Sequence, residues 1–246
     1  MTDANFLVFF IILSFSNAVE TITGFGSTII ALTLGAHIYP IDFLVPVLVP
    51  VNIVLSAYIV VRHHRAVVHS VLWRNILPAA GLGLLIGAAL FNIIKSETLA
   101  FAYGVFVLFF SIFELSRAVR SYPHKEFSWL QAIFWLLSGG IIQGIYASGG
   151  PLIVFYASRK LHDKGNFRST LSALWLILNI VLLISHILTG KTTPITIRSS
   201  ASLLPAMVLG IIIGERLHSL IPARAFRIFI FIVLIVAGAS LILRLY

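Results

Sequence analysis

The 246-residue chain has no cysteine, and its Asp and Glu residues together number only eight. Without cysteine it forms no disulfide, binds no metal through thiolates and has no thiol nucleophile. A catalytic carboxylate pair is also hard to assemble from so few acidic residues. The sequence lacks a His-Glu-x-x-His zinc motif, a Walker A phosphate loop and a Gly-x-Ser-x-Gly elbow. It therefore predicts no enzyme, no cofactor and no metal site.

Apolar residues are abundant: 59% of the chain is hydrophobic, 10% is charged, and the mean hydropathy is +1.05. A soluble protein cannot cover its surface with so few charges. Eight apolar stretches approach or exceed the roughly 20 residues with which a helix crosses a bilayer. They are residues 6–36, 43–61, 71–92, 98–116, 128–158, 169–188, 199–215 and 223–243. The composition predicts one all-α transmembrane domain over residues 1–246, embedded in the lipid bilayer.

The formal net charge of +9 does not indicate a nucleic-acid partner. The Lys and Arg residues lie in short connections between apolar stretches, where membrane topology accounts for them. No Lys or Arg precedes the first apolar stretch, so we expect no cleaved signal peptide.

The sequence repeats itself at an offset of 127 residues. Residues 52–55, Asn-Ile-Val-Leu, return at 179–182, and seven of the eleven residues from 77 to 87 are identical in 204–214. Because both matches share one offset, the chain is an internal duplication. We place the repeats at residues 1–122 and 123–246. Many membrane transporters are built from two such halves, with the substrate held where the halves meet.

The distribution of positive charge predicts that the two halves are inverted. Eight simple crossings would divide the Lys and Arg residues 9 to 8 across the membrane, which is no bias. The first apolar stretch of each half is interrupted, at Gly24-Phe25-Gly26 and at Ser148-Gly149-Gly150-Pro151. The piece after each break reaches only about 12 to 16 Å as a helix, half a bilayer. If each interrupted stretch turns back, each half is a re-entrant hairpin plus three spans.

The charges then divide 13 to 4, with only Lys95, Lys191, Arg198 and Arg244 on the sparse side. The positive-inside rule places the thirteen in the cytoplasm and both termini outside. Re-entrant backbone is tolerated at membrane depth only beside protein or a water-filled cavity, so we expect the hairpin tips to line a cavity.

The two breaks predict an anion site. Each starts a half-helix whose first N–H groups have no intrahelical partner and whose dipole adds partial positive charge. Two such ends that meet near the midplane bind an anion without a buried Lys or Arg. The candidate residues are Gly24, Gly26, Ser27 and Thr28 in the first half and Ser148, Gly149, Gly150 and Pro151 in the second. The alternative is that these glycines only let helices pack closely, which is also the prediction for the pairs Gly83/Gly87 and Gly210/Gly214.

Three further polar residues lie inside apolar stretches. Asn52 and Asn179 occupy equivalent places in the two halves, and they either contact the substrate or only hold helices together. Glu20 lies one turn before Gly24, where a charged carboxylate costs about 3 kcal/mol to insert. Burial favours the uncharged form, so Glu20 either exchanges a proton during transport or shapes the hairpin while neutral. We expect nothing equivalent to Glu20 in the second half, where Gln143 and Tyr146 are the polar residues nearby.

With its duplicated plan and these two glycine segments, the chain resembles the sulfite exporter TauE/SafE family over nearly its whole length. The resemblance implies a transporter that exports small anions, sulfite or organosulfonates such as sulfoacetate, across a bacterial cytoplasmic membrane. No ATP-binding segment is present, so active transport would draw on an ion gradient, for example of protons, or on an external partner. The alternatives are a carrier or channel for another small solute and a membrane-embedded enzyme or assembly factor.

Overall fold

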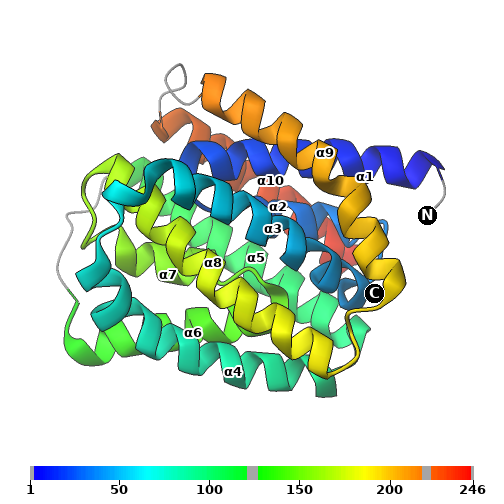
Figure 1. The fold of residues 1–246 in the computed structure, drawn as a ribbon, viewed down its shortest axis with the longest axis horizontal. Coiled ribbons are helices and arrows are strands. Elements are labelled where there is room, and N and C mark those ends of the chain that lie inside the picture. Colours follow the sequence, from blue (N-terminus) through cyan, green and yellow to red (C-terminus); the bar gives the residue numbers. More distant parts are fainter. Residues whose placement is uncertain (1–2, 121–126, 218–222, 245–246) are drawn as a thin grey trace.

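The computed structural model describes residues 3–120, 127–217 and 223–244, and within these ranges the chain is helical with no strand (Figure 1). The first half contains α1 (Asp3–Thr23), α2 (Ser27–Gly35), α3 (Ile41–His63), α4 (Leu77–Ile93) and α5 (Ser96–Arg120). A 3-10 turn (His64–Ala66) and a π-helix (Val71–Ile76) join α3 to α4. The second half contains α6 (Trp129–Tyr146), α7 (Gly150–Ala157), α8 (Lys164–Leu188), α9 (Pro194–Leu217) and α10 (Ala223–Arg244).

The prediction of an all-α membrane protein is confirmed. Among the described residues, seven helices are long and apolar enough to cross a membrane, and the apolar part of α10, Ile228–Leu243, is shorter. These helices expose Leu, Ile, Val and Phe side chains to the outside of the bundle, where lipid replaces water as the solvent.

Both helical breaks fall at residues with positive φ. Gly24 and Gly26 have φ angles of 84° and 104° between α1 and α2. Ala147, the residue that ends α6, has a φ of 51° although it carries a Cβ atom. The left-handed conformation ends each long helix and lets the chain change direction before the next helix begins.

Each short helix then turns back along the long helix before it. The end of α2 returns to the start of α1, because a Cβ atom added at Gly35 would lie 2.6 Å from the Phe9 ring. In the second half, the ring centroids of Phe155 on α7 and Trp135 on α6 are 4.7 Å apart. α2 has nine residues and α7 has eight, so each spans about 12 to 14 Å, close to half the hydrocarbon thickness.

The helices pair mainly across the two halves. α1 packs on α9, α4 on α6, α3 on α8 and α5 on α10. Figure 1 shows α4 and α6 side by side along one edge and α3 and α8 through the middle. In the two halves α1 corresponds to α6, α3 to α8, α4 to α9 and α5 to α10. Exchanging each helix for its counterpart gives the same four pairs, as a two-fold relation requires. The inversion of the halves stays a prediction, and the predicted boundary between residues 122 and 123 lies outside the described residues.

Glycine pairs bring the backbones of paired helices into contact. A Cβ atom added at Gly87 on α4 would lie 2.1 Å from the Ile141 carbonyl oxygen on α6, and one at Gly210 on α9 would lie 2.6 Å from the Ser14 carbonyl oxygen on α1. The predicted role of these glycines in close helix packing is confirmed.

Candidate anion site between the hairpin tips

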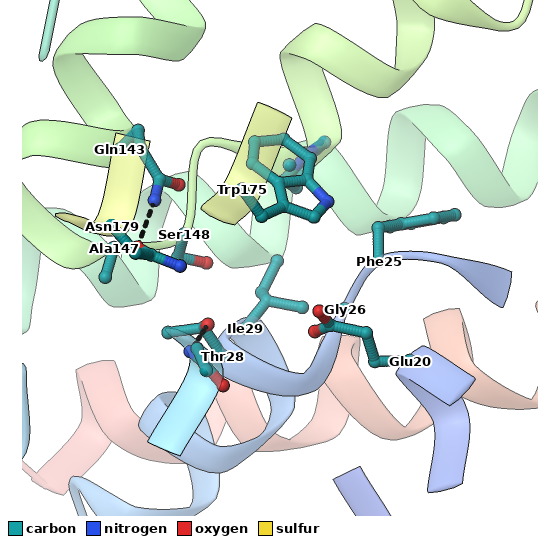
Figure 2. Close-up of a pocket in the computed structure, with 13 residues that line it drawn as sticks. Glu20, Phe25, Gly26, Thr28, Ile29, Gln143, Ala147, Ser148, Trp175 and Asn179 are labelled. Carbon is teal, nitrogen blue, oxygen red and sulfur yellow. Dashed lines mark hydrogen bonds between the residues drawn. The ribbon is translucent and has the colours of Figure 1, made fainter. Parts of the chain in front are cut away.

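The two hairpin tips meet at a cavity of about 20 Å³. Its lining comes from both tips and from the two central helices, α3 and α8. Figure 2 shows Glu20 and Thr28 on one side of this space and Gln143, Ser148 and Trp175 on the other. The lining residues are Glu20, Phe25, Gly26, Thr28, Ile29, Asn52, Gln143, Ala147, Ser148, Gly150, Pro151, Trp175 and Asn179. No Lys or Arg belongs to this lining.

The first tip is held by a network around Ser27, the first residue of α2. The Ser27 backbone N–H donates to Glu20 Oε2 over 3.1 Å, and the Ser27 hydroxyl makes a very short hydrogen bond to the same oxygen. The hydroxyl also lies 3.1 Å from Asn52 Oδ1, while Asn52 Nδ2 donates to Thr28 Oγ1 over 2.6 Å. Glu20 is only 4% exposed. A carboxylate therefore caps the N-terminus of α2, where the helix dipole favours negative charge.

The second tip repeats this arrangement with an amide in place of the acid. The Gly149 N–H donates to Gln143 Oε1 over 2.9 Å, and Gln143 Nε2 donates to Asn179 Oδ1 over 2.9 Å. Gln143 thus accepts from a tip N–H as Glu20 does, but it bonds to Asn179 directly, whereas Glu20 is linked to Asn52 through the Ser27 hydroxyl.

The expectation that nothing in the second half is equivalent to Glu20 was therefore wrong, because Gln143 occupies the equivalent position. It is an amide and not an acid. The cause is the repeat offset. The hairpins correspond at an offset of 123 residues, since α1 ends at Thr23 and α6 at Tyr146, whereas the Asn pair corresponds at 127.

Two aromatic residues attach the tips to the surrounding helices. Tyr103 on α5 donates its hydroxyl to Ser148 Oγ over 3.0 Å, and Trp175 on α8 donates its indole N–H to the Gly24 carbonyl oxygen over 3.0 Å. Both aromatic residues are buried. The tips are thus fixed by hydrogen bonds to α5 and α8 as well as by their own helices.

The structure brings most of the predicted site residues together. Glu20, Gly26, Thr28, Asn52, Ser148, Gly150, Pro151 and Asn179 line the cavity, and Ser27 bonds to two of them. Gly24 and Gly149 lie behind the cavity wall. A Cβ atom at Gly24 would lie 2.8 Å from the Arg168 Cα atom, and one at Gly149 would lie 2.0 Å from the Gly139 carbonyl oxygen. For these two positions the alternative role, close packing, is the one that the contacts support.

Five residues line the cavity that were not predicted as site residues from the sequence: Phe25, Ile29, Gln143, Ala147 and Trp175. A signal for Gln143 was available, because this polar residue precedes the break in its half by the same spacing with which Glu20 precedes its own. Trp175 stands in an apolar stretch and gave no comparable signal.

The cavity offers hydrogen-bond donors to an anion, although no cationic side chain lines it. The first-turn amides of α2 and α7 have no intrahelical partner, and the hydroxyls of Thr28 and Ser148 and the amides of Asn52 and Gln143 lie around the same space. Among the described residues, no group of three or more His, Asp or Glu side chains is placed to hold a metal ion.

Comparison with known proteins identifies the family of the chain. Residues 8–241 match the family model described as sulfite exporter TauE/SafE. The chain belongs to this family. A probable inner membrane transporter protein, TsaS of Comamonas testosteroni, is 24% identical over 184 residues, covering 71% of this chain and 74% of the relative. No solved structure matches the chain. The protein is a multi-pass membrane transporter.

Proposed function

We propose that this member of the family exports a small sulfur-containing anion, sulfite or an organosulfonate, across the bacterial cytoplasmic membrane. The anion binds between the N-termini of α2 and α7. The observation that carries the proposal is the convergence of two half-helix N-termini on one cavity whose lining contains no Lys or Arg. The family membership and the transporter relative support the chemical class of the cargo.

Glu20 is the residue through which we propose proton coupling. Its carboxylate accepts from both the N–H and the hydroxyl of Ser27, and when ionised it places a negative charge at the first tip. When Glu20 is protonated, its O–H donates to Ser27 Oγ, and the Ser27 hydroxyl turns to Asn52 Oδ1, 3.1 Å away. Protonation also removes the charge that repels the anion. Anion binding and proton uptake are then linked.

The cavity must widen during transport. Its volume of about 20 Å³ accommodates about one water molecule, whereas sulfite contains one sulfur and three oxygen atoms. We propose that the structure is a closed state, and that one group of helices moves against the other to open the site alternately to the two sides.

Flux into liposomes that contain the purified protein tests the proposal. The panel comprises sulfite, sulfate, sulfoacetate, taurine and carboxylates. Saturable flux of sulfite or sulfoacetate supports the proposed cargo, and preference for a carboxylate or taurine replaces it with another solute. If no member of the panel crosses, the proposed cargo is wrong, and transport of another class of solute takes its place.

Gly150 is the position at which a side chain tests the site without disturbing the fold. A Cβ atom at Gly150 meets its nearest neighbours, Trp175 and Phe25, at 3.8 and 3.9 Å, which is ordinary contact. We expect Gly150→Ala to fold normally and to reduce flux several-fold, because its methyl group enters the cavity. Unchanged flux would contradict the location of the site. Gly149 does not serve this test, because a side chain there collides with α6 backbone.

A further inference from the structure

The central helices carry matching rows of residues that lead away from the cavity. On α3 the row is Asn52, Ser56, Ile59 and His63, and on α8 it is Asn179, Trp175, Ser172 and Arg168. Both rows advance in steps of four, three and four residues, so each row lies on one face of its helix. Each extends about 16 Å along the helix axis, half the hydrocarbon thickness.

The two rows meet at both ends. Asn52 and Asn179 line the same cavity. At the other end, the 3-10 turn that follows His63 packs on α8, and the Val68 N–H donates to Thr170 Oγ1 over 2.9 Å. α3 and α8 pack against each other between these points, and we call the two rows together the α3–α8 seam. The seam therefore connects the cavity to the end of the bundle at which Arg62 and Arg65 lie.

Several polar atoms in the seam are buried and unsatisfied. Ser56 Oγ, Ser172 Oγ, His63 Nε2 and Arg168 Nε have no hydrogen-bond partner in the part of the chain that the structure describes. Both serines are fully buried. Leaving such groups unpaired is costly in a packed interior, and two helices that only needed to adhere would carry apolar side chains there. Groups of this kind are satisfied when water or an ion passes between the helices.

Arg168 supplies a cation at the outer end of the seam. Arg168 is only 6% exposed, and its guanidinium donates to Glu215 Oε1 over 2.6 Å. The Arg168 backbone also lies against Gly24 of the first tip. An arriving anion offers acceptor oxygens as the Glu215 carboxylate does, so it can compete with Glu215 for the Arg168 guanidinium.

We propose that the α3–α8 seam is the route by which the anion passes between the cavity and the basic end of the bundle, with Arg168 as the first group that captures it. Glu215 stays bound to the Arg168 guanidinium until the anion takes its place there. The route rests on the proposed function, since it assigns a path to the same cargo. It also assigns roles to Arg168 and Ser172, which lie outside the cavity lining.

Cysteine accessibility tests the route without requiring transport, because the chain contains no cysteine and a single introduced thiol is the sole target. Ser172→Cys and Ser56→Cys replace one small side chain by another on opposite walls of the seam. The matched control is Ser111→Cys on α5, also fully buried with its hydroxyl unpartnered among the described residues. Arg65→Cys, at an exposed residue, marks the basic side.

In vesicles of the full chain treated with a membrane-impermeant methanethiosulfonate, we expect the seam cysteines to react from the side on which Arg65→Cys reacts. The rate should exceed that of Ser111→Cys at least ten-fold, and sulfoacetate, which does not react with the thiosulfonate, should slow it. Seam cysteines that react no faster than the control, or only from the opposite side, would overturn the route whatever the flux assay shows. Reaction from the expected side in a protein that moves no anion would retain the route and overturn the proposed cargo.

Paired substitutions separate anion capture by Arg168 from a purely structural ion pair. Arg168→Gln removes the cation, whereas Glu215→Gln removes only its partner. Capture predicts that Arg168→Gln raises the KM for sulfite about ten-fold with little change in kcat, while Glu215→Gln leaves KM equal or lower. Equal losses in the two variants would show that the pair only stabilises the fold.

Discussion

At the scale of residues, the two hairpin tips differ chiefly in one functional group. Glu20 and Gln143 make equivalent hydrogen bonds to their own tips, but only Glu20 can lose a proton. A glutamine has the shape of a neutral glutamic acid, so the second tip resembles the first tip in its protonated form. The molecule therefore has one tip that can change its charge, at Glu20, and one tip that stays neutral, at Gln143.

Glu20→Gln is therefore expected to preserve the fold and to remove the pH dependence of transport. The new amide oxygen accepts from the Ser27 N–H as Gln143 accepts from Gly149. Wild-type flux should fall as pH rises, because the ionised carboxylate then occupies the α2 N-terminus, while the variant's flux should stay level. Flux of sulfoacetate into liposomes across a pH series near neutrality measures this, because the charge of sulfoacetate stays constant there, whereas sulfite itself takes up a proton. A variant with the rate and pH dependence of the wild type would show that Glu20 is structural.

Asn52, Asn179 and the glycine breaks were predictable because a polar or glycine residue inside an apolar stretch needs a reason to be there. Arg168 was visible too, but charge counting explained it as a topology signal, and its pairing with Glu215 joins residues 47 positions apart. Trp175 was not predictable as a site residue, since a tryptophan in an apolar helix can face either the lipid or the core. Its partner, the Gly24 carbonyl, is 151 residues away.

At the scale of elements, close approach of glycine backbones holds the halves together. On α4, Gly83 and Gly87 face α6 backbone, whereas a Cβ atom at Gly81 would meet nothing within 4 Å. The repeat of the glycine pairs was visible in the sequence. Which helix each pair contacts was not, because the partner of each pair, α6 for the pair on α4 and α1 for the pair on α9, belongs to the opposite half.

Gly87→Ala and Gly81→Ala make a matched test of this packing. The added methyl at position 87 forces α4 away from α6, and we expect a loss of about 1 to 3 kcal/mol in the free energy of unfolding. At position 81 the same change should raise stability by up to about 1 kcal/mol, because alanine favours the helix. Thermal unfolding in detergent compares the two. Equal effects would contradict the close packing at Gly87.

At the scale of the whole molecule, the pairing of helices across the halves places one hairpin tip from each half at a shared cavity. Hairpins, lengths of the half-helices and the all-α class followed from the sequence, since glycine breaks and apolar run lengths are local signals. The meeting of the tips at one point depends on contacts among α3, α5 and α8 that no local signal contains. A site formed in this way needs both halves.

The most direct test of the account measures whether sulfite stabilises the purified protein through the two tips. A saturating ligand, at 100 times its dissociation constant, stabilises by about 2.7 kcal/mol and raises the melting temperature. We predict such a rise for the wild type and for Asn92→Leu, a control on α4 outside the cavity lining. We predict none for the double variant Asn52→Leu with Asn179→Leu. A rise that survives in the double variant, or its absence in the wild type with sulfite and sulfoacetate alike, would contradict anion binding between the tips.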